Sequence, residues 1–253
     1  ITQPVLMTAS VAIWRLWQMQ GGLNPALLAG HSLGEYSALV CAEAISFSDA
    51  IKLVHQRGLY MQEAVPAGVG KMAAILGLDA ASIETACNQS EQYGVASIAN
   101  YNSPGQIVIA GDAQAVDTAS ALCTEAGAKR IAELNVSVPS HCELMKPAAD
   151  KLKHVLDTTL FQTPRIPIVQ NVDAERSDSA SAIKDRLINQ LFKPVLWIQC
   201  LAVLRHAGCT SLVECGPGKI LSGLTKRSEP TMSSLPTHDL TSISIALAHC
   251  QNN

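Results

Sequence analysis

A five-residue stretch near the start of the chain has the pattern of a turn that exposes a nucleophilic serine. Residues 30–34 read Gly-His-Ser-Leu-Gly and fit GxSxG, in which the glycines permit a sharp strand-to-helix turn and push the central Ser32 toward a substrate. The N-terminus of the following helix would direct N–H groups and a positive dipole end at the place where an oxyanion develops. The pattern predicts Ser32 as a nucleophile; the alternative is a glycine-rich turn whose serine only caps the next helix.

Ser32 needs a base within hydrogen-bond reach, because a serine hydroxyl is protonated and weakly nucleophilic at neutral pH. Among the seven histidines, His31 adjoins Ser32, but neighbouring side chains at such a turn point apart. His141 follows Pro139 in a stiffened loop that can hold it over a cleft, although a loop histidine of this kind is more often a surface residue with no role. The other five lie on predicted helices or near the C-terminus and are weaker candidates: His55, His154, His206, His238 and His249.

Arg57 is a permanent charge in an apolar setting. In the helix predicted over residues 48–64, it lies in the middle of a stripe formed by Ala50, Ile51, Leu53, Val54, Gly58 and Met61. A guanidinium in such a stripe is costly unless it pairs with an anion. The anion is either a buried Asp or Glu of the protein or a carboxylate of the substrate that Arg57 clamps in bidentate fashion.

The elements that must position these residues read as a mixed α/β protein. Helices are predicted over 4–20, from 34 to 42, and over 48–64, 143–159, 181–191 and 197–207, with short apolar strands over 26–29, 166–171 and 211–215. This alternation predicts a parallel sheet covered by helices on both faces. The segment 228–242 is rich in Ser, Thr and Pro, and we expect it to be loosely ordered.

Between two breaks in the helical pattern, residues 69–138 form a separate unit. The order is strand (72–76), helix (80–89), strands (95–99 and 106–110), helix (113–126) and strand (130–136), which is a βαββαβ arrangement. We therefore predict a large catalytic subdomain made of residues 1–68 and 139–227, an inserted small subdomain over 69–138, and a tail over 228–253.

Composition excludes several classes of function. A formal net charge of -3 without clustered cations argues against a nucleic-acid-binding surface. The sequence has no uncharged apolar stretch of about 18 residues, so we predict no membrane span. The eight cysteines form no CxxC pair and no cluster with histidine at zinc spacing, so we expect reduced thiols and no metal site.

Six segments together resemble the bacterial malonyl-CoA:acyl carrier protein transacylase family. They follow in order along nearly the whole chain: GHSLGEYSALV at 30–40, HQRG around Arg57, ANYNSPGQIVIAG at 99–111, SVPSHCELMKPAA at 137–149, NQLFKPV at 189–195 and ECGPGK at 214–219. The resemblance implies an α/β-hydrolase-like large subdomain with a parallel sheet and an inserted ferredoxin-like subdomain. The last segment lacks the spacing of a phosphate-binding loop and is better explained as a turn at a strand end.

The resemblance also implies a role for each candidate residue. Ser32 corresponds to the nucleophile, His141 to its base and Arg57 to the ligand of the malonyl carboxylate. The histidine of the family is oriented by a backbone carbonyl, and Gln190 occupies the matching position. Leu33 corresponds to an oxyanion-hole donor through its main-chain N–H, and Asn100 to a residue that lines the site.

The implied reaction moves a malonyl group from malonyl-CoA to the phosphopantetheine thiol of acyl carrier protein, in fatty acid biosynthesis. It needs no cofactor beyond its substrates, and we expect a cytoplasmic monomer. Carrier proteins are usually acidic, so four basic residues are candidates for a docking patch: Lys193, Arg205, Lys219 and Arg227.

Three alternatives stay open: an acyltransferase that serves a polyketide synthase in trans, a serine thioesterase or esterase, and a non-catalytic carrier-binding module. Family members begin with a strand and a GQGSQ-type loop that supplies the second oxyanion donor, and nothing resembling it occurs in residues 1–253. We therefore expect the sequence to be a fragment of an active enzyme, with impaired activity on its own, because losing one oxyanion donor costs about 10²–10³ in rate.

Overall fold

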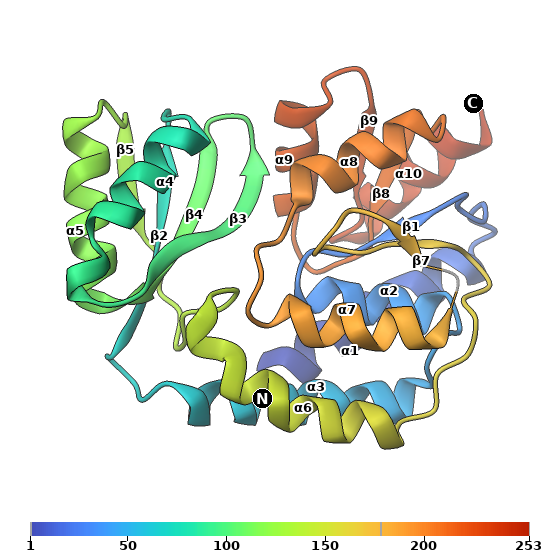
Figure 1. The fold of residues 1–253 in the computed structure, drawn as a ribbon. Coiled ribbons are helices and arrows are strands. Elements are labelled where there is room, and N and C mark those ends of the chain that lie inside the picture. Colours follow the sequence, from blue (N-terminus) through green and yellow to red (C-terminus); the bar gives the residue numbers. More distant parts are fainter. Residues whose placement is uncertain (1, 178, 253) are drawn as a thin grey trace. The chain divides into compact units, whose positions relative to one another are not determined.

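The computed structural model describes residues 2–177 and 179–252, and these divide into two compact units (Figure 1). The first unit comprises Ile1–His55, Thr159–Ile183 and Gln199–Asn253, and the second comprises Gln56–Thr158 and Lys184–Ile198. The second unit thus contains the predicted insertion over residues 69–138 together with residues 56–68, 139–158 and 184–198.

The first unit contains two small sheets among its described residues. In one sheet, β1 (Leu28–Ala29) pairs in parallel with β6 (Ile168–Val169), which pairs antiparallel with β7 (Arg176–Ser177). In the other sheet, β8 (Ser211–Glu214) pairs in parallel with β9 (Ser233–Pro236). The predicted parallel pairing is therefore present, but it is divided between two sheets, and β7 adds an antiparallel edge that the sequence did not predict.

The helices of the first unit can each bury one face, because their apolar residues recur at helical spacing. In α1 (Thr2–Met19), Met7, Val11 and Trp14 are buried at intervals of four and three residues. Trp14 packs in one apolar cluster with Ala246 of α10 (Leu240–Gln251). The first unit also holds α2 (Leu33–Cys41), the start of α3 (Phe47–Ala64), most of α8 (Trp197–His206), and α9 (Ile220–Ser228).

The expectation of a loosely ordered segment over residues 228–242 is wrong. Residues 233–236 form β9, whose four residues pair with β8, and Asp239 caps α10 through reciprocal hydrogen bonds with Ser242. Ser242, one of the Ser and Thr residues that suggested a loose tail, instead takes part in this helix cap. The strand that pairs with β9 is β8, which comes before the tail in the chain.

The second unit is built on an antiparallel sheet with the strand order β3-β4-β2-β5 (blue-green to yellow-green in Figure 1). Its elements follow the predicted βαββαβ order: β2 (Gly70–Leu76), α4 (Ala80–Gln89), β3 (Ala96–Ser103), β4 (Gln106–Asp112), α5 (Ala113–Glu125) and β5 (Arg130–Glu133). Ile75, Ile83 and Val116 join β2, α4 and α5 in a core on one face of the sheet. On the other face, Met72 and Val108 pack against Cys142, which lies in the loop after β5.

Two segments from outside the insertion complete the second unit. A short 3-10 helix (Glu143–Met145) leads into α6 (Lys146–Thr158), and α7 (Ala180–Gln190) ends in it. The chain after α7 is tied to β3, because Tyr101 N donates to Val195 O at 2.9 Å and Val195 N donates to Ala99 O at 2.9 Å. In the part of the chain that the structure describes, no helix combines the length and the apolar composition that crossing a membrane requires.

Candidate active site

Ser32 lies in the first unit at a sharp turn between β1 and α2, as the GxSxG pattern predicts. A side chain on Gly30 would collide with the backbone of Gly34, so only glycine fits there. Ser32 itself has φ 52° and ψ -109°, a conformation that non-glycine residues rarely adopt and that costs free energy. The surrounding structure must therefore hold this turn in place.

A buried asparagine holds the turn from both sides. The N–H of Ser32 donates to Oδ1 of Asn171 at 2.7 Å, and Nδ2 of Asn171 donates to the carbonyl of Gly30 at 2.8 Å. Asn171 is held in turn by Glu35 in the first turn of α2, whose carboxylate accepts its N–H at 2.9 Å and Nε2 of Gln170 at 3.1 Å. Asn171, Gln170 and Glu35 are completely buried.

Sequence reasoning missed these three residues. The available signal was their position: Gln170 and Asn171 directly follow β6, which runs parallel to β1 in the register Ala29↔Val169. Parallel neighbouring strands end at the same edge of a sheet, which is where α/β proteins place functional groups. The pairing of β1 with β6, however, depends on a contact about 140 residues apart in the chain.

Among the N–H groups of residues 32–35, that of Leu33 has no acceptor in the described hydrogen bonds. Ser32 N is taken by Asn171, Gly34 N donates to His31 O at 2.9 Å, and Glu35 N donates to Ser32 O at 3.1 Å. Leu33 is the first residue of α2, so its N–H lies at the positive end of the helix dipole. This geometry suits the predicted role of Leu33 as an oxyanion donor.

His141 lies in the second unit, buried to 3% exposure, in the loop that leads to α6. The ring nitrogen Nδ1 is 2.6 Å from the carbonyl oxygen of Gln190, and the main-chain N–H of His141 donates to the carbonyl of Leu191 at 2.9 Å. A carbonyl can only accept, so Nδ1 carries the proton and Nε2 is left as the basic nitrogen. The loop has φ 66° at His141, another strained position.

Arg57 lies on α3 with 2% of its surface exposed. Its Nη2 donates to Oε1 of Gln190 at 3.2 Å, so the acceptor in this bond is a neutral amide. Gln190 is itself completely buried and contacts Arg57 through its side chain and His141 through its main chain. The structure thus brings His141, Gln190 and Arg57 together in the second unit.

Asn100 also belongs to the second unit, and its predicted place beside the other residues is supported only by the backbone. It is 6% exposed on β3 and forms a parallel bridge with Val195, a few residues after Gln190. Ser32 and Leu33 belong to the first unit. That all six residues line one site stays a prediction.

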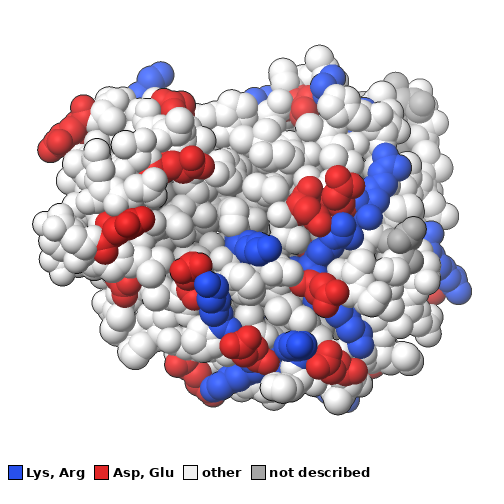
Figure 2. Space-filling view, in the orientation of Figure 1, with Lys and Arg blue, Asp and Glu red and all other residues white. Residues whose placement is uncertain are grey.

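The predicted docking residues are divided between the units as well. Lys193 belongs to the second unit, and Arg205, Lys219 and Arg227 belong to the first. Arg205 pairs with Glu229 at 2.9 Å. The face drawn in Figure 2 carries basic and acidic side chains next to one another, which does not by itself mark a site for an acidic partner.

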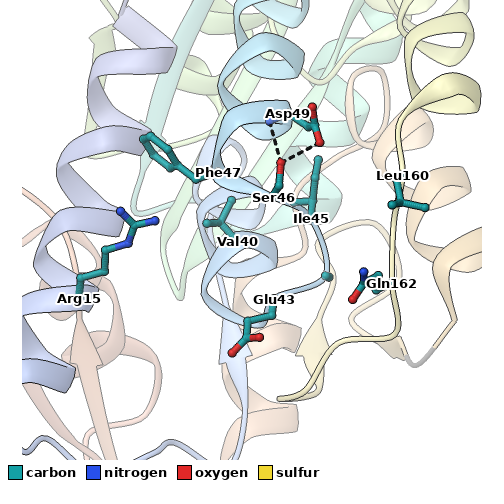
Figure 3. A pocket seen from close by; sticks show the side chains of 10 residues that line it. Arg15, Val40, Glu43, Ile45, Ser46, Phe47, Asp49, Leu160 and Gln162 are labelled. Atoms are coloured by element: carbon teal, nitrogen blue, oxygen red, sulfur yellow. Dashed lines mark hydrogen bonds between the residues drawn. The ribbon is translucent and has the colours of Figure 1, made fainter.

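A pocket of about 350 Å³ in the first unit is distinct in composition from the predicted site. Figure 3 shows Arg15 of α1 on one side, Leu160 and Gln162 on the other, and the connection from α2 to α3 between them. Ser46, the serine in its lining, donates to Oδ2 of Asp49 at 2.7 Å, and the lining includes no histidine or cysteine. The lining therefore offers no serine–histidine or cysteine–histidine pair.

The remaining reactive groups are cysteines, and none is activated. All eight are free thiols. Burial raises the pKa of Cys41, Cys87 and Cys142 to about 12 in each case, which opposes thiolate formation. Within residues 2–177 and 179–252, no group of three or more His, Cys, Asp or Glu side chains could hold a metal ion.

Comparison with known proteins places the chain in a family. Residues 1–233 match the family described as acyl transferase domain. The malonyl CoA-acyl carrier protein transacylase of Salmonella typhimurium is 55% identical over 246 residues, which are 97% of this chain and 80% of that protein. The protein of that name from Bacillus subtilis is 46% identical over 97% of this chain and 77% of that protein.

Solved structures agree with the sequence comparison. A malonyl-transacylase in complex with a type II PKS acyl-carrier protein has a TM-score of 0.96 and 53% identity, and the match covers all of this chain and 81% of that chain. An acyl carrier protein S-malonyltransferase from Vibrio cholerae has a TM-score of 0.94 and 54% identity over 96% of this chain and 80% of that chain. The chain therefore belongs to the acyl transferase family that includes the malonyl CoA-acyl carrier protein transacylases.

Proposed function

We propose that the chain catalyses transfer of a malonyl group from malonyl-CoA to the phosphopantetheine thiol of acyl carrier protein. The observation that carries this proposal is the double use of Gln190, whose carbonyl orients His141 and whose amide oxygen contacts Arg57. One buried residue thus couples a general base to a cation that can bind a carboxylate. The relatives named for this reaction support the same function.

The first half of the reaction acylates Ser32. Nε2 of His141 takes the hydroxyl proton as Oγ attacks the thioester carbonyl, and the N–H of Leu33 stabilises the oxyanion that forms. The carbon–sulfur bond then breaks, and the coenzyme A thiolate leaves with the proton from His141. The contact between Nδ1 and the Gln190 carbonyl keeps the imidazole in the tautomer that this step requires.

The second half returns the enzyme to its starting state. The carrier thiol gives its proton to His141 and attacks the Ser32 ester, and Oγ leaves as the hydroxyl by taking that proton back. Throughout both halves, Arg57 and Asn100 bind the malonyl group. Arg57 selects malonyl over acetyl, because only malonyl carries a carboxylate that a buried guanidinium can bind in bidentate fashion.

The finer architecture that we propose follows the same family. The first unit is α/β-hydrolase-like, and residues 69–138 form a ferredoxin-like insertion, supported by the strand order β3-β4-β2-β5. The protein acts as a cytoplasmic monomer with no cofactor beyond its substrates, and Lys193, Arg205, Lys219 and Arg227 contact an acidic carrier.

A second candidate function is acyl transfer to the carrier of a polyketide synthase. The match to the transacylase bound to a type II PKS acyl-carrier protein favours it. The chemistry is the same, so only the carrier distinguishes the two.

The test is to incubate the protein with radiolabelled malonyl-CoA, with and without holo carrier protein. We expect one labelled ester on Ser32 without the carrier, and its discharge onto the carrier thiol when the carrier is added. Ser32→Ala removes the label altogether. Discharge to water at an equal rate with and without carrier would identify a thioesterase, and failure of a correctly folded protein to form the ester would favour a non-catalytic carrier-binding module. Fatty acid and polyketide carriers, compared at equal concentration, separate the two transferase functions.

A further inference from the structure

Glu35 is a buried acid that the proposed mechanism does not use. It has no exposed surface and lies at the third position of α2, where a negative charge is favoured by the helix dipole. Burying a carboxylate is costly unless hydrogen bonds satisfy it. Here Oε2 accepts the N–H of Asn171 at 2.9 Å and Oε1 accepts Nε2 of Gln170 at 3.1 Å.

These bonds fix the residue that in turn fixes the nucleophile. With its own N–H held by Glu35, Asn171 uses Oδ1 on the N–H of Ser32 and Nδ2 on the carbonyl of Gly30. The Asn171 side chain therefore bridges the two peptide groups on either side of His31. No other side chain reaches both of these groups in the described hydrogen bonds.

The bridge has two consequences for the reacting groups. It opposes relaxation of Ser32 from its strained φ of 52°, which would move Oγ away from the direction in which the turn presents it. It also occupies the N–H of Ser32, so that among residues 32–35 the N–H of Leu33 is the donor available to an oxyanion. The position of the Ser32 hydroxyl and the use of the Leu33 N–H as oxyanion donor therefore both depend on Asn171.

We propose that Asn171 and the carboxylate of Glu35 are positioning residues for acyl transfer, acting through the Ser32 turn and not on the substrate. The inference rests on the proposed function for its substrate, but its geometry lies wholly within the first unit. A misplacement of a reacting atom by about 1 Å costs about 100-fold in rate. The proposal therefore predicts loss of rate without loss of substrate affinity.

The first experiment measures single-turnover acylation of Ser32 over a range of malonyl-CoA concentrations. Asn171→Ala is expected to lower the maximal rate by about 100-fold, with the half-saturating concentration changed less than about three-fold. Glu35→Gln is expected to lower the rate by about 10-fold, because a neutral amide oxygen replaces the carboxylate oxygen that accepts the Asn171 N–H, and the new NH₂ meets Nε2 of Gln170 in the orientation that Gln170 has in the structure.

A swap variant provides the rescue. In Glu35→Gln combined with Gln170→Glu, the new amide at position 35 can accept from Asn171 N and donate to the new carboxylate at position 170. Both hydrogen bonds are thereby restored with one carboxylate in the site, and we expect acylation to recover to within about three-fold of the wild-type rate. A rate that stays as low as in the single Glu35→Gln variant would overturn the role assigned to Glu35.

Glu214→Gln is the matched control. Glu214 also accepts backbone N–H groups at the start of a helix in the first unit, from Leu221 at 3.0 Å and Ser222 at 2.7 Å. Its replacement should lower the melting temperature and leave single-turnover acylation unchanged. If the Asn171 and Glu35 variants behave in the same way, their role is structural only and the proposal is wrong.

A second probe separates this proposal from the proposed function. A fluorophosphonate reacts with an activated serine without needing malonyl recognition, and its attachment to Ser32 is measured by mass spectrometry for each variant. Slower attachment in Asn171→Ala and Glu35→Gln with recovery in the swap supports positioning, even if malonyl-CoA fails to acylate the wild type and the proposed substrate is wrong. Equal attachment in wild type and all variants overturns the positioning role. Should Asn171→Ala fail to fold, the Glu35→Gln and swap pair decides the matter.

Discussion

At the scale of single residues, Arg57 gives the sharpest test of substrate choice. It is 2% exposed, and its described bond is to the neutral amide of Gln190. In the proposed complex, Arg57 pairs with the malonyl carboxylate, and truncating one partner of such a buried, hydrogen-bonded charge pair costs about 2–5 kcal/mol. Arg57→Ala should therefore lower kcat/KM for malonyl-CoA by about 100-fold or more, while kcat/KM for acetyl-CoA changes by less than about three-fold.

The kcat/KM values for malonyl-CoA and acetyl-CoA are measured by steady-state transfer to one carrier protein at fixed ionic strength. Arg165→Ala is the control, because Arg165 is an exposed arginine paired with Glu43 and should have no effect on either substrate. A loss of equal size for malonyl and acetyl transfer would show that Arg57 supports the fold and does not select the substrate.

Residues with unusual local patterns could be predicted from the sequence, and residues made important by distant contacts could not. Ser32 stands between two glycines, and Arg57 interrupts an apolar stripe, so each is visible within one turn or one helix. Glu35 and Asn171 look like ordinary polar residues of a helix and a loop. Only the parallel pairing of β1 with β6 buries both of them against the serine turn.

At the scale of elements, the cap of α10 predicts how stability depends on pH. Oδ1 of Asp239 accepts the N–H of Ser242 at 2.7 Å, and hydrogen bonds from Ser242 hold the pKa of Asp239 below its ordinary value of 3.8. A carboxyl whose pKa is lower in the folded state stabilises the fold above its ordinary pKa, and this contribution is lost as pH falls through the lowered pKa.

Two variants separate the cap from the charge. Asp239→Ala should lower the melting temperature at pH 7 by about 3 °C, because alanine cannot cap. Asp239→Asn should keep most of the stability at pH 7, since asparagine caps as well as aspartate, but should lose less stability than the wild type below about pH 4. Thermal unfolding at pH 7 and below about pH 4 measures these changes in melting temperature, with Asp150→Asn inside α6 as the control. An identical fall in melting temperature in acid for the wild type and Asp239→Asn would contradict the prediction.

Elements with a complete local signal were predicted with accurate ends. The helix predicted over residues 80–89 matches α4, because Asp79 provides a cap that accepts the N–H of Ser82 at 2.9 Å. The same kind of cap begins α10, but the Ser-, Thr- and Pro-rich stretch before it hid the signal. β7 was missed because two residues, Arg176 and Ser177, give no alternation to read, and their pairing with β6 depends on the turn between Gln170 and Glu175.

At the scale of the whole molecule, the order of elements along the chain could be predicted more fully than their division into units. The βαββαβ order of the second unit follows the chain and could be read from it. The division into units could not, because residues 184–198 return to the second unit through hydrogen bonds between Val195 and β3. Such returns are decided by burial over the whole chain and not by any local pattern.

Thiol reactivity reports on the packing of both units at once. Cys87, Cys123, Cys142 and Cys200 are buried, and burial raises the pKa of each thiol above its ordinary value of 9.0. The thiolate is the reactive form, so iodoacetamide at pH 8 should modify these four at least about 100-fold more slowly in the folded protein than in concentrated guanidinium chloride. Mass spectrometry of the digested protein, after a short pulse of reagent, assigns the rate for each cysteine.

The same raised pKa values predict that the fold weakens in alkali. A thiol whose pKa is higher in the folded state contributes stability that is complete below the unfolded pKa, near 9.0, and that is lost as pH rises toward the folded value of about 12 for Cys87 and Cys142. The melting temperature should therefore fall between pH 8 and pH 10, and this fall should be smaller in Cys142→Ala than in the wild type, even if the variant melts lower at pH 8. Equal falls in melting temperature in both proteins would mean that groups other than Cys142 control the alkaline transition. In the labelling experiment, equal rates for Cys142 in folded and unfolded protein would mean that the loop before α6 does not pack on the sheet as the structure has it.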